Sequence, residues 1–499
     1  MLLIWVVVSV GLLLRVGLAW ILPPGYDEAY YLFYGKNLDL SYFDHPVAVG
    51  IWSWLGQSLG LGLFGLRLPS VLSYTAATLV LADATHRWYG RGARLWVVVL
   101  ATACPLVFVC GGILLLPDSP LLLALSLFLW WLSRHGTLTP SRFGEAVQFA
   151  LLAALLTLSK YHAFLLLPSI LGLSLGRADG RQAWKAPWPY LSVLIWALLT
   201  APLWLWNLNY DWVSFLFQGG RTGAAPGLQL DGSALFLISQ IGLLFPVIGL
   251  LLMAMLWPTS CRGIGNPQAT SLLRWLAWPQ LLVFAALAAR MQVMASWLVP
   301  AWWITLPIAA AWLATKGWRS WRVRRGVLIT SCVLPPLLVL AGAQMRWGVL
   351  NSFLPASQDP SSQLMHPDDL RSALRSDPKL WDLIQKADII ASHRYEIPGF
   401  LALALPDHPS GRFTTLNSDA RGFAFWPSFR SDRGSRGLLI APLEPGSLLA
   451  QREFPAPIHS VQPLGTVLVR RSGVPTVELE IASFEADPGR YPWPYGAPN

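Results

Sequence analysis

The chain alternates long apolar runs with short polar segments over its first 345 residues. A membrane-spanning helix needs roughly 20 apolar residues, and most of the runs are close to that length. The first run has neither a charged start nor a small-residue cleavage site before Pro23, so we expect it to be retained as a span. The pattern predicts about eleven transmembrane helices, at residues 1–22, 68–88, 95–116, 119–133, 145–158, 163–176, 188–206, 233–256, 272–289, 296–315 and 326–343.

The pattern changes after residue 345, where the chain becomes richer in charge and proline. The stretches ADIIAS, GLLIAPL and GTVLVRR are typical of strands, and we expect helices at 366–386 and 396–405. A segment of about 150 residues is long enough for a small domain. We therefore predict an α-helical polytopic membrane protein with a transmembrane domain at 1–345 and a soluble α/β domain at 346–499.

Composition supports the membrane assignment. Hydrophobic residues make up 54% of the chain and charged residues only 12%, against about 25% in soluble proteins, and the mean hydropathy is +0.49. Many of the 27 tryptophans lie near the ends of apolar runs, where their amphipathic rings suit the headgroup layer. An ordinary soluble protein is excluded.

Charge indicates the orientation. The formal net charge is +10, yet residues 346–499 hold 15 Lys or Arg against 16 Asp or Glu, so the excess lies in the membrane part. Basic loops facing anionic lipid explain this better than nucleic-acid binding. Alternate loops carry the cations, at Arg87, Arg91, Arg94, Arg134, Arg142, Arg177, Arg181, Lys185, Arg262, Lys316, Arg319, Arg322, Arg324 and Arg325. By the positive-inside rule these loops are cytoplasmic, so the loop 23–67 and the C-terminal domain face the periplasm or exterior of an inner (plasma) membrane.

The four cysteines lie in apolar segments or a short loop, and none follows residue 345. They form neither a disulfide framework nor a metal-ligand spacing. The sequence therefore indicates no metal site, and we expect that no cofactor is required, with a divalent metal as the alternative.

The stretch PPGYDEAYYLFYGKNLDLSYFDHP clusters acidic residues directly after the first span. Asp27 follows a helix-breaking Pro-Pro-Gly, which places it in the first turn of a new helix, where the helix dipole favours a carboxylate. Tyr30, Tyr31 and Tyr34 would share its face. A carboxylate beside phenols suits a polyhydroxylated substrate, and a helix cap with an interfacial tyrosine belt is an equally good alternative.

Further ionisable residues interrupt apolar sequence on the predicted outer side, where each is a functional candidate because burial of charge is costly. Asp44-His45-Pro46 gives the first loop a second acidic point, in which His45 orients the carboxylate, binds a phosphate or is an ordinary loop histidine. Asp118, in LLLPDSPLLL, is either a third acid or a helix cap.

Two cations on the same predicted side suit an anionic headgroup. Lys160 lies with Tyr161 and His162 in ALLTLSKYHAFLLLP, where a snorkelling lysine is the alternative. Arg221, in FQGGRTG, could hold a phosphate through two hydrogen bonds.

In the order DEAYY, YFDHP, PDSP and LSKYHAFLLLP, the sequence resembles the GT-C membrane glycosyltransferases. Within them it is most similar to the bacterial relatives of protein O-mannosyltransferases and of the lipid A aminoarabinose transferase. The resemblance covers most of residues 1–345 and extends more weakly into the C-terminal part. It implies a polyprenyl-phosphate-linked sugar donor, transfer outside the cytoplasm, inversion at the anomeric carbon and a lipid, glycan or protein acceptor.

The resemblance also implies residue roles. Asp27 matches the catalytic acid of the first outer loop, which would act as general base, with Glu28 as its partner. The remaining matches are the second acidic pair, Asp44 and His45, the next outer acid, Asp118, and the donor-phosphate ligands, Lys160 and Arg221. We expect substrate contacts from Tyr30, Tyr31, Tyr34, Tyr161 and His162. His45 stands where the lipid A enzymes have lysine, which argues against a lipid A acceptor.

Three other readings of the sequence are open. A transporter or lipid flippase also needs intramembrane charges, but the acids cluster in one outer loop rather than at midplane, and no paired halves appear. Another GT-C reaction, such as oligosaccharide or O-antigen transfer, is a closer alternative. A structural membrane subunit would leave the acidic cluster unexplained.

Overall fold

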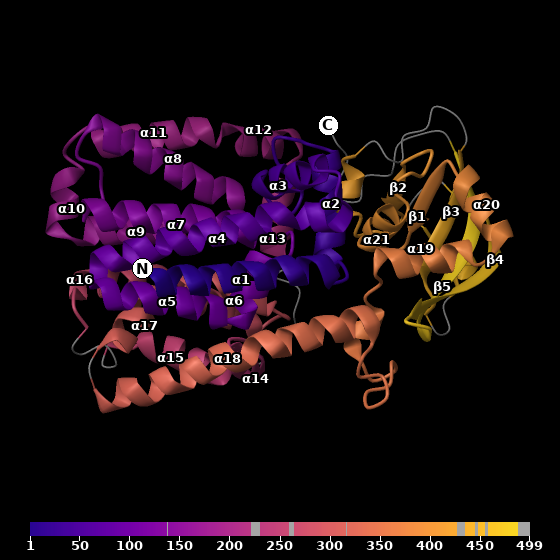
Figure 1. Cartoon of the computed structure of the whole chain (residues 1–499). Coiled ribbons are helices and arrows are strands. Elements are labelled where there is room, and N and C mark those ends of the chain that lie inside the picture. Colours follow the sequence, from indigo (N-terminus) through magenta and orange to yellow (C-terminus); the bar gives the residue numbers. More distant parts are fainter. Residues whose placement is uncertain are drawn as a thin grey trace. The chain divides into compact units, whose positions relative to one another are not determined.

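The computed structural model describes all residues except 137, 221–229, 259–263, 316, 427–434, 445–447, 455–457 and 488–499. Arg221, Cys261, Arg262 and Lys316 lie outside the described residues. The chain divides into two compact units (Figure 1), one made of Met1–Gly17, His45–Trp52 and Arg67–Leu337, the other of Leu18–Asp44, Ser53–Leu66 and Leu338–Asn499. Four of the five boundaries fall inside α1 (Leu2–Ile21), α3 (Ala48–Ser58), α4 (Gly62–Tyr89) and α18 (Trp318–Trp347), and the fifth, between Asp44 and His45, lies in the segment before α3.

The first unit is a helix bundle around an apolar core. Beside its parts of α1, α3, α4 and α18 it contains α5 (Arg91–Ala103), α6 (Pro105–Gly112), α7 (Asp118–His135), α8 (Phe143–Ser159), α9 (Ala163–Gly176), α10 (Ala178–Ala183), α11 (Trp188–Leu199), α12 (Ala201–Asn209), α13 (Val213–Gly220), α14 (Leu230–Leu243), α15 (Pro246–Met255), α16 (Pro267–Ala288) and α17 (Val299–Ala314).

Helix α17 lies in the middle of this bundle and packs against α5. Its adjacent Trp302 and Trp303 are fully buried, and their indole N–H groups donate hydrogen bonds to Gln240 Oε1 and Ser126 Oγ, each 2.9 Å long. A buried indole needs such a partner. These two tryptophans are therefore core residues, outside the interfacial belts that the composition suggested.

Every predicted apolar run coincides with helix, but the predicted count of about eleven spans is not confirmed. Among the described residues, five helices are long and apolar enough to cross a membrane, or up to eight if each of three bent pairs is one span. The bends, between α5 and α6, α11 and α12, and α14 and α15, are 77°, 49° and 119°. Each second helix begins with a proline in its first turn, at Pro105, Pro202 or Pro246. Proline lacks the backbone N–H of a continuing helix, which explains the breaks.

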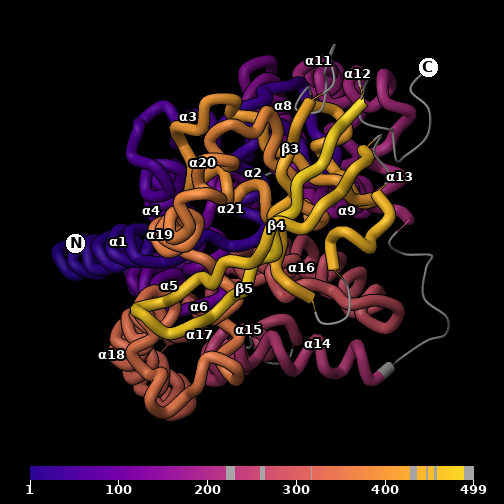
Figure 2. The backbone as a smooth tube through the Cα atoms, turned by 90° about the vertical axis from the view of Figure 1, so that its right-hand side faces the viewer, coloured from indigo at the N-terminus to yellow at the C-terminus, as the bar shows by residue number. Residues whose placement is uncertain are grey.

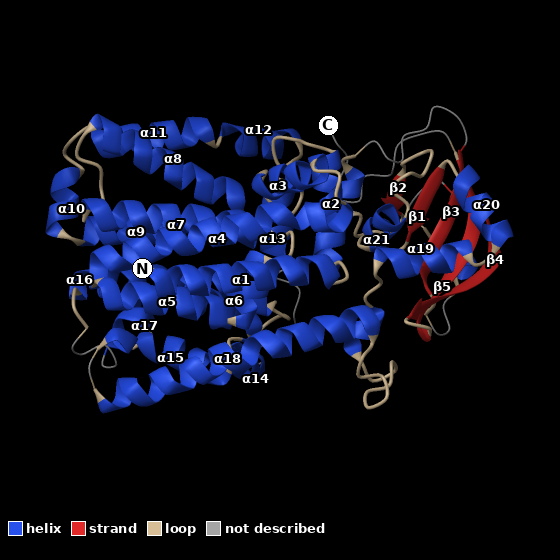
Figure 3. Cartoon of the chain, in the orientation of Figure 1, coloured by secondary structure: helices blue, strands red, loops and turns tan. Residues whose placement is uncertain are grey.

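The second unit contains a five-stranded sheet in the order β2-β1-β3-β5-β4 (Figure 3). Its strands are β1 (Ile389–Ser392), β2 (Phe413–Thr415), β3 (Ser435–Pro442), β4 (Ile458–Arg471) and β5 (Val474–Ala486). β1 pairs in parallel with β2 and β3, and the other pairs are antiparallel. Ser472 and Gly473, both with positive φ, join β4 to β5 as the tight two-residue turn of a long hairpin (Figure 2).

The C-terminal elements match the sequence pattern in part. The three predicted strands are β1, β3 and β4, whereas β2 and β5 were not predicted. The helix expected at 366–386 is two helices, α19 (Pro367–Arg375) and α20 (Pro378–Lys386), because the first ends at its C-cap Ser376 and Asp377 caps the second by accepting from Lys379 N and Leu380 N. The helix expected at 396–405 is α21 (Ile397–Ala404).

Helix α21 packs against α2 (Tyr26–Lys36), which belongs to the first predicted outer loop. Both helices lie in the second unit. Gly399 of α21 touches the backbone of Ala29, so a Cβ at this position would overlap the Ala29 carbonyl group. This close approach brings the segments that flank α21 to the face of α2 that carries the predicted acids.

Candidate functional site

The helix predicted after Pro-Pro-Gly is present as α2. The backbone N–H of Gly25 donates a hydrogen bond of 3.1 Å to Oε2 of Glu28, which is fully buried. This contact satisfies a backbone donor at the helix start. The carboxylate of Glu28 therefore caps the helix, whereas its neighbour Asp27 is partly exposed.

Tyr30, Tyr34 and Asp44 form a buried hydrogen-bonded cluster. Asp44 Oδ1 accepts hydrogen bonds from both phenols, that of Tyr30 across 3.3 Å. Burial, with a smaller contribution from Asp44, raises the pKa of Tyr30 well above its ordinary value, and burial followed by Asp27 and Asp44 does the same for Tyr31. The phenols therefore stay protonated and act as donors.

Arg421, which sequence reasoning did not select, is the charge partner of Asp44. One terminal nitrogen of its guanidinium lies 3.4 Å from Asp44 Oδ2, and its Nε lies 3.3 Å from Asp419 Oδ2. Burial is the largest single influence and lowers the pKa of Arg421, but the contributions of Asp44, Tyr395 and Asp419 together outweigh burial and raise the pKa overall. Arg421 stays charged and compensates Asp44.

Tyr395 connects the two predicted acids of this loop. Its phenol donates a hydrogen bond of 3.2 Å to Asp27 Oδ1, and the guanidinium carbon of Arg421 lies 3.7 Å from the centre of its ring. Arg421 has a φ of +48°, a conformation that non-glycine residues rarely adopt. A strained arginine beside two carboxylates is typical of a functional site. No local sequence pattern predicts that Tyr395 or Arg421 lies beside the acids of the first loop.

The two acids differ in what they can do chemically. Asp44 is only 3% exposed, accepts two phenol hydrogen bonds and faces a guanidinium, so its charge is already compensated. Asp27 is partly exposed and accepts its hydrogen bond from the neutral phenol of Tyr395. A proton acceptor must be within reach of the substrate. Asp27 suits proton transfer, and Asp44 suits a structural or orienting role.

A second cluster lies in the first unit. Asp118 is the first residue of α7, and Lys160 follows the end of α8. Lys160 Nζ donates to both carboxylate oxygens of Asp118, across 2.8 and 2.9 Å, and both side chains are buried. Asp118, which was predicted to be a catalytic acid or a helix cap, is thus the counter-ion of Lys160, the predicted phosphate ligand.

Three further predicted residues belong to the same unit. His162 Nε2 lies 3.0 Å from the Trp297 carbonyl oxygen, and the ring of Tyr161 stacks on Phe164. His45 is half-buried and begins the segment His45–Trp52 of this unit. In the described part of the chain, no group of three or more His, Cys, Asp or Glu residues could hold a metal ion.

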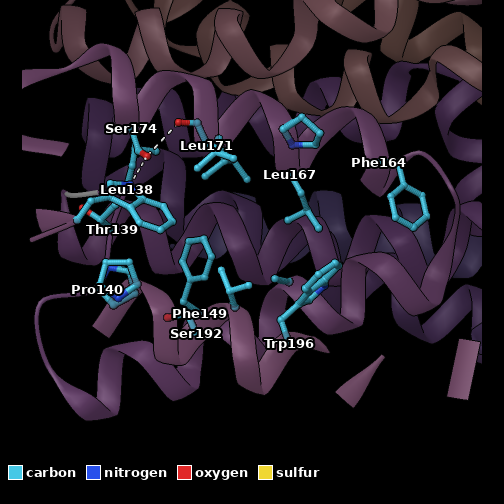
Figure 4. A pocket seen from close by; sticks show the side chains of 16 residues that line it. Leu138, Thr139, Pro140, Phe149, Phe164, Leu167, Leu171, Ser174, Ser192 and Trp196 are labelled. Atoms are coloured by element: carbon cyan, nitrogen blue, oxygen red, sulfur yellow. Dashed lines mark hydrogen bonds between the residues drawn. The ribbon is translucent and has the colours of Figure 1, made fainter. Parts of the chain in front are cut away.

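An apolar cavity of about 300 Å³ lies beside α9 in the first unit (Figure 4). Its walls come from α8, α9, α11 and the segment after α7, and Phe164, Leu167, Leu171 and Ser174 line it in succession along α9. At 1.5 Å per residue, this run is about 15 Å long. This run begins four residues after Lys160, so the lysine and the apolar cavity are close together along the chain.

Comparison with known proteins gives a family match and a related sequence. Residues 44–206 match the model of the dolichyl-phosphate-mannose-protein mannosyltransferase family. The lipid A galacturonosyltransferase RgtD of Rhizobium johnstonii is 27% identical over 301 residues, and the match covers 58% of this chain and 61% of that relative. The chain therefore matches less than two thirds of the relative's length.

Solved structures share the whole fold. ArnT from Cupriavidus metallidurans in the apo state superposes with a TM-score of 0.61 at 16% identity, over 96% of this chain and 97% of that one. The structure of ArnT bound to undecaprenyl phosphate gives the same values.

Proposed function

We propose that this chain, a relative of the protein mannosyltransferases with the GT-C fold, transfers a sugar from a polyprenyl-phosphate donor to an acceptor hydroxyl. The predicted resemblance and the predicted fold class are confirmed by the family match and by the fold shared with ArnT. The relatives reported above are transferases, which favours this function over a transporter or flippase. Transfer takes place on the extracytoplasmic side of an inner (plasma) membrane, where the positive-inside rule puts the first loop.

The partly exposed carboxylate of Asp27, held by Tyr395, is the observation that carries the mechanism. As general base, Asp27 takes the proton of the acceptor hydroxyl while that oxygen attacks the anomeric carbon. The bond from this carbon to the phosphate oxygen breaks with inversion, and polyprenyl phosphate leaves as an anion. Asp44 orients Tyr30 and Tyr34 and, through Arg421, supports Tyr395.

Lys160 is the proposed ligand of the donor phosphate. An ammonium group has three donors, two of which go to Asp118, so the third is available for a phosphate oxygen. The adjacent apolar cavity along α9 would take the first part of the polyprenyl chain. Undecaprenyl phosphate bound to ArnT supports a lipid-linked donor of this type. Arg221, outside the described residues, keeps its proposed role as a second phosphate ligand.

The acceptor is a lipid, a glycan or a protein. A lipid A galacturonosyltransferase among the relatives supports a lipid acceptor, whereas His45 at the lysine position of the aminoarabinose transferases argues against lipid A. We propose that residues 346–499 form an extracytoplasmic domain and that their part in the reaction is the placement of Tyr395 and Arg421.

The test is transfer by the purified full chain from a panel of polyprenyl-phosphate sugars, with Asp27→Asn and Asp39→Asn side by side. Asp39 is an exposed acid of the same loop and serves as the matched control. General-base catalysis predicts that Asp27→Asn lowers the rate roughly 100- to 10,000-fold while Asp39→Asn keeps it. Consumption of no donor would refute the function, and full activity of Asp27→Asn on a working donor would refute the mechanism.

A further inference from the structure

A second cavity, of about 570 Å³, lies within the unit that contains the sheet. It is separate from the candidate site, since none of Asp27, Tyr395 and Arg421 lines it. Its walls include the last residues of α1, the first residues of α4 and the last residues of α18, together with parts of α2, α19 and α21. Helices α1, α4 and α18 are all candidate membrane spans. A cavity where three spans begin or end lies at the level of a membrane surface.

The apolar side of the cavity carries aromatic residues that are typical of the membrane surface. Trp20 lies at the end of α1, and its ring packs edge-on against Phe64 at 5.1 Å. Trp347, the last residue of α18, also lines the cavity. Trp20 and Trp347 are 67% and 45% exposed, as expected of rings that rest among lipid headgroups.

The polar side carries more positive than negative charge. Lys36, Arg346 and Arg371 line the cavity, with Asp368 as the acid among the lining residues. Arg346 is already paired with Asp368 and Asp369, across 3.5 and 3.1 Å. Two cations therefore remain to be matched by a ligand.

Lys36 and Arg371 have no carboxylate partner among the described residues. The ammonium of Lys36 lies 5.7 and 6.0 Å from the ring centres of Phe33 and Phe413. Arg371 uses its Nε for the Ala404 carbonyl oxygen, at 2.6 Å, which fixes the guanidinium and leaves its two terminal nitrogens for another acceptor. A guanidinium held in this way suits two hydrogen bonds to one phosphate.

We propose that this cavity binds the phosphate group of an anionic membrane lipid, with Lys36 and Arg371 on the phosphate and Trp20, Phe64 and Trp347 beside the glycerol and acyl carbons. The inference needs only the membrane location of the spans and does not depend on sugar transfer. A soluble phosphate would use the cations but leave the aromatic wall without a partner. The site would fix the ends of three spans next to α2, the helix that carries Asp27.

The test is lipid binding by the purified full chain in a neutral detergent, measured by native mass spectrometry. The probes are phosphatidylglycerol, phosphatidylcholine with the same acyl chains, and inorganic phosphate as competitor. We expect phosphatidylglycerol to bind at least about ten-fold more tightly than phosphatidylcholine, and Lys36→Gln and Arg371→Gln each to weaken it about five-fold, as the loss of one surface cation predicts. Lys379→Gln, which removes an exposed cation of α20 outside the cavity, should leave binding unchanged.

Equal binding of the two phospholipids would overturn the proposal, and so would unchanged phosphatidylglycerol binding in the Lys36→Gln, Arg371→Gln double variant. Displacement of phosphatidylglycerol by an equal concentration of inorganic phosphate would overturn the lipid assignment. Arg371 also holds α21 through Ala404, so a thermal melt accompanies each variant. Lys36 lies at an exposed position, so its variant tests the site even where Arg371→Gln unfolds.

Discussion

The phenol of Tyr395 donates a hydrogen bond of 3.2 Å to Asp27 Oδ1, although 368 positions separate the two residues along the chain. Through this bond the segment before α21 holds the carboxylate that follows the first span. The ring of Tyr395 in turn carries the guanidinium of Arg421, the partner of Asp44. The C-terminal part of the chain is thus built into the candidate site rather than appended to it.

Tyr395→Phe should lower the transfer rate about ten-fold, because the loss of one hydrogen bond to a charged group is worth about 1.5 kcal/mol. The defect should appear in kcat at saturating donor, since the phenol orients the base and does not hold the donor. Initial rates over a range of donor concentrations measure it. Tyr190→Phe, at an exposed tyrosine of α11, is the control and should behave as wild type. A change confined to KM would contradict the orienting role.

Gly399→Ala should separate α21 from α2, because its Cβ would overlap the Ala29 carbonyl group. Backbone atoms cannot move aside as a flexible side chain can, so we expect a loss of stability of about 1–3 kcal/mol. Activity should fall further in Gly399→Ala than in Tyr395→Phe, because the new methyl group displaces both Tyr395 and the face of α2 that carries Asp27. Thermal melts and transfer rates check both effects. Gly144→Ala, at a helical position with open space around its Cβ, should change neither; equal melts for the two variants would refute the packing argument.

Lys160→Met should destabilise the bundle by about 3–5 kcal/mol, because it leaves the buried carboxylate of Asp118 without its counter-ion. The double variant Asp118→Leu, Lys160→Met removes both charges and should recover most of that stability. It should not recover transfer, since the proposed phosphate ligand is still missing. A thermal-shift cycle over the single and double variants measures the coupling. Recovery of activity in the double variant would assign Lys160 a purely structural role.

Acid should destabilise the second unit through Asp359. This carboxylate accepts hydrogen bonds from Gln344, Ser361 and Arg471, at 2.7 to 2.9 Å. Burial raises its pKa, but these bonds outweigh burial and lower the pKa to about 2. A carboxylate with a lowered folded-state pKa stabilises the fold above its unfolded pKa of about 4, and that stability is lost as the pH falls toward 2.

The contribution of Asp359 at neutral pH is about 2–3 kcal/mol, from a pKa difference of about two units at about 1.4 kcal/mol each. Asp359→Asn should lose this stability at pH 7 and show a flatter stability curve between pH 4 and pH 2, as followed by thermal melts. Asp407→Asn, at an exposed loop position, is the charge-matched control. An Asp359→Asn protein as stable as wild type at pH 7 would contradict the assignment.

The sequence predicted where the apolar helices lie better than it predicted where they break. All eleven predicted runs are helical because a span is defined by its own apolar residues, a local property. Three of them are broken, since a proline near the middle of a run leaves its mean hydropathy high while it interrupts the backbone. In the C-terminal part, β2 was missed because three residues carry too little pattern, whereas β5 was missed although the alternation in its VELEI segment is itself typical of a strand.

By itself the sequence determined which segments are apolar enough to lie in a membrane, which loops carry the basic charge, and which acids interrupt that apolar background. These are properties of neighbouring residues. Only the tertiary structure decided how the acids are used: Glu28 caps a helix, Asp44 is compensated by Arg421, Asp118 by Lys160, and Asp27 keeps a partly exposed carboxylate held by Tyr395. The charge and basicity of a carboxylate depend on the groups packed around it, and those groups come from segments that no local pattern connects.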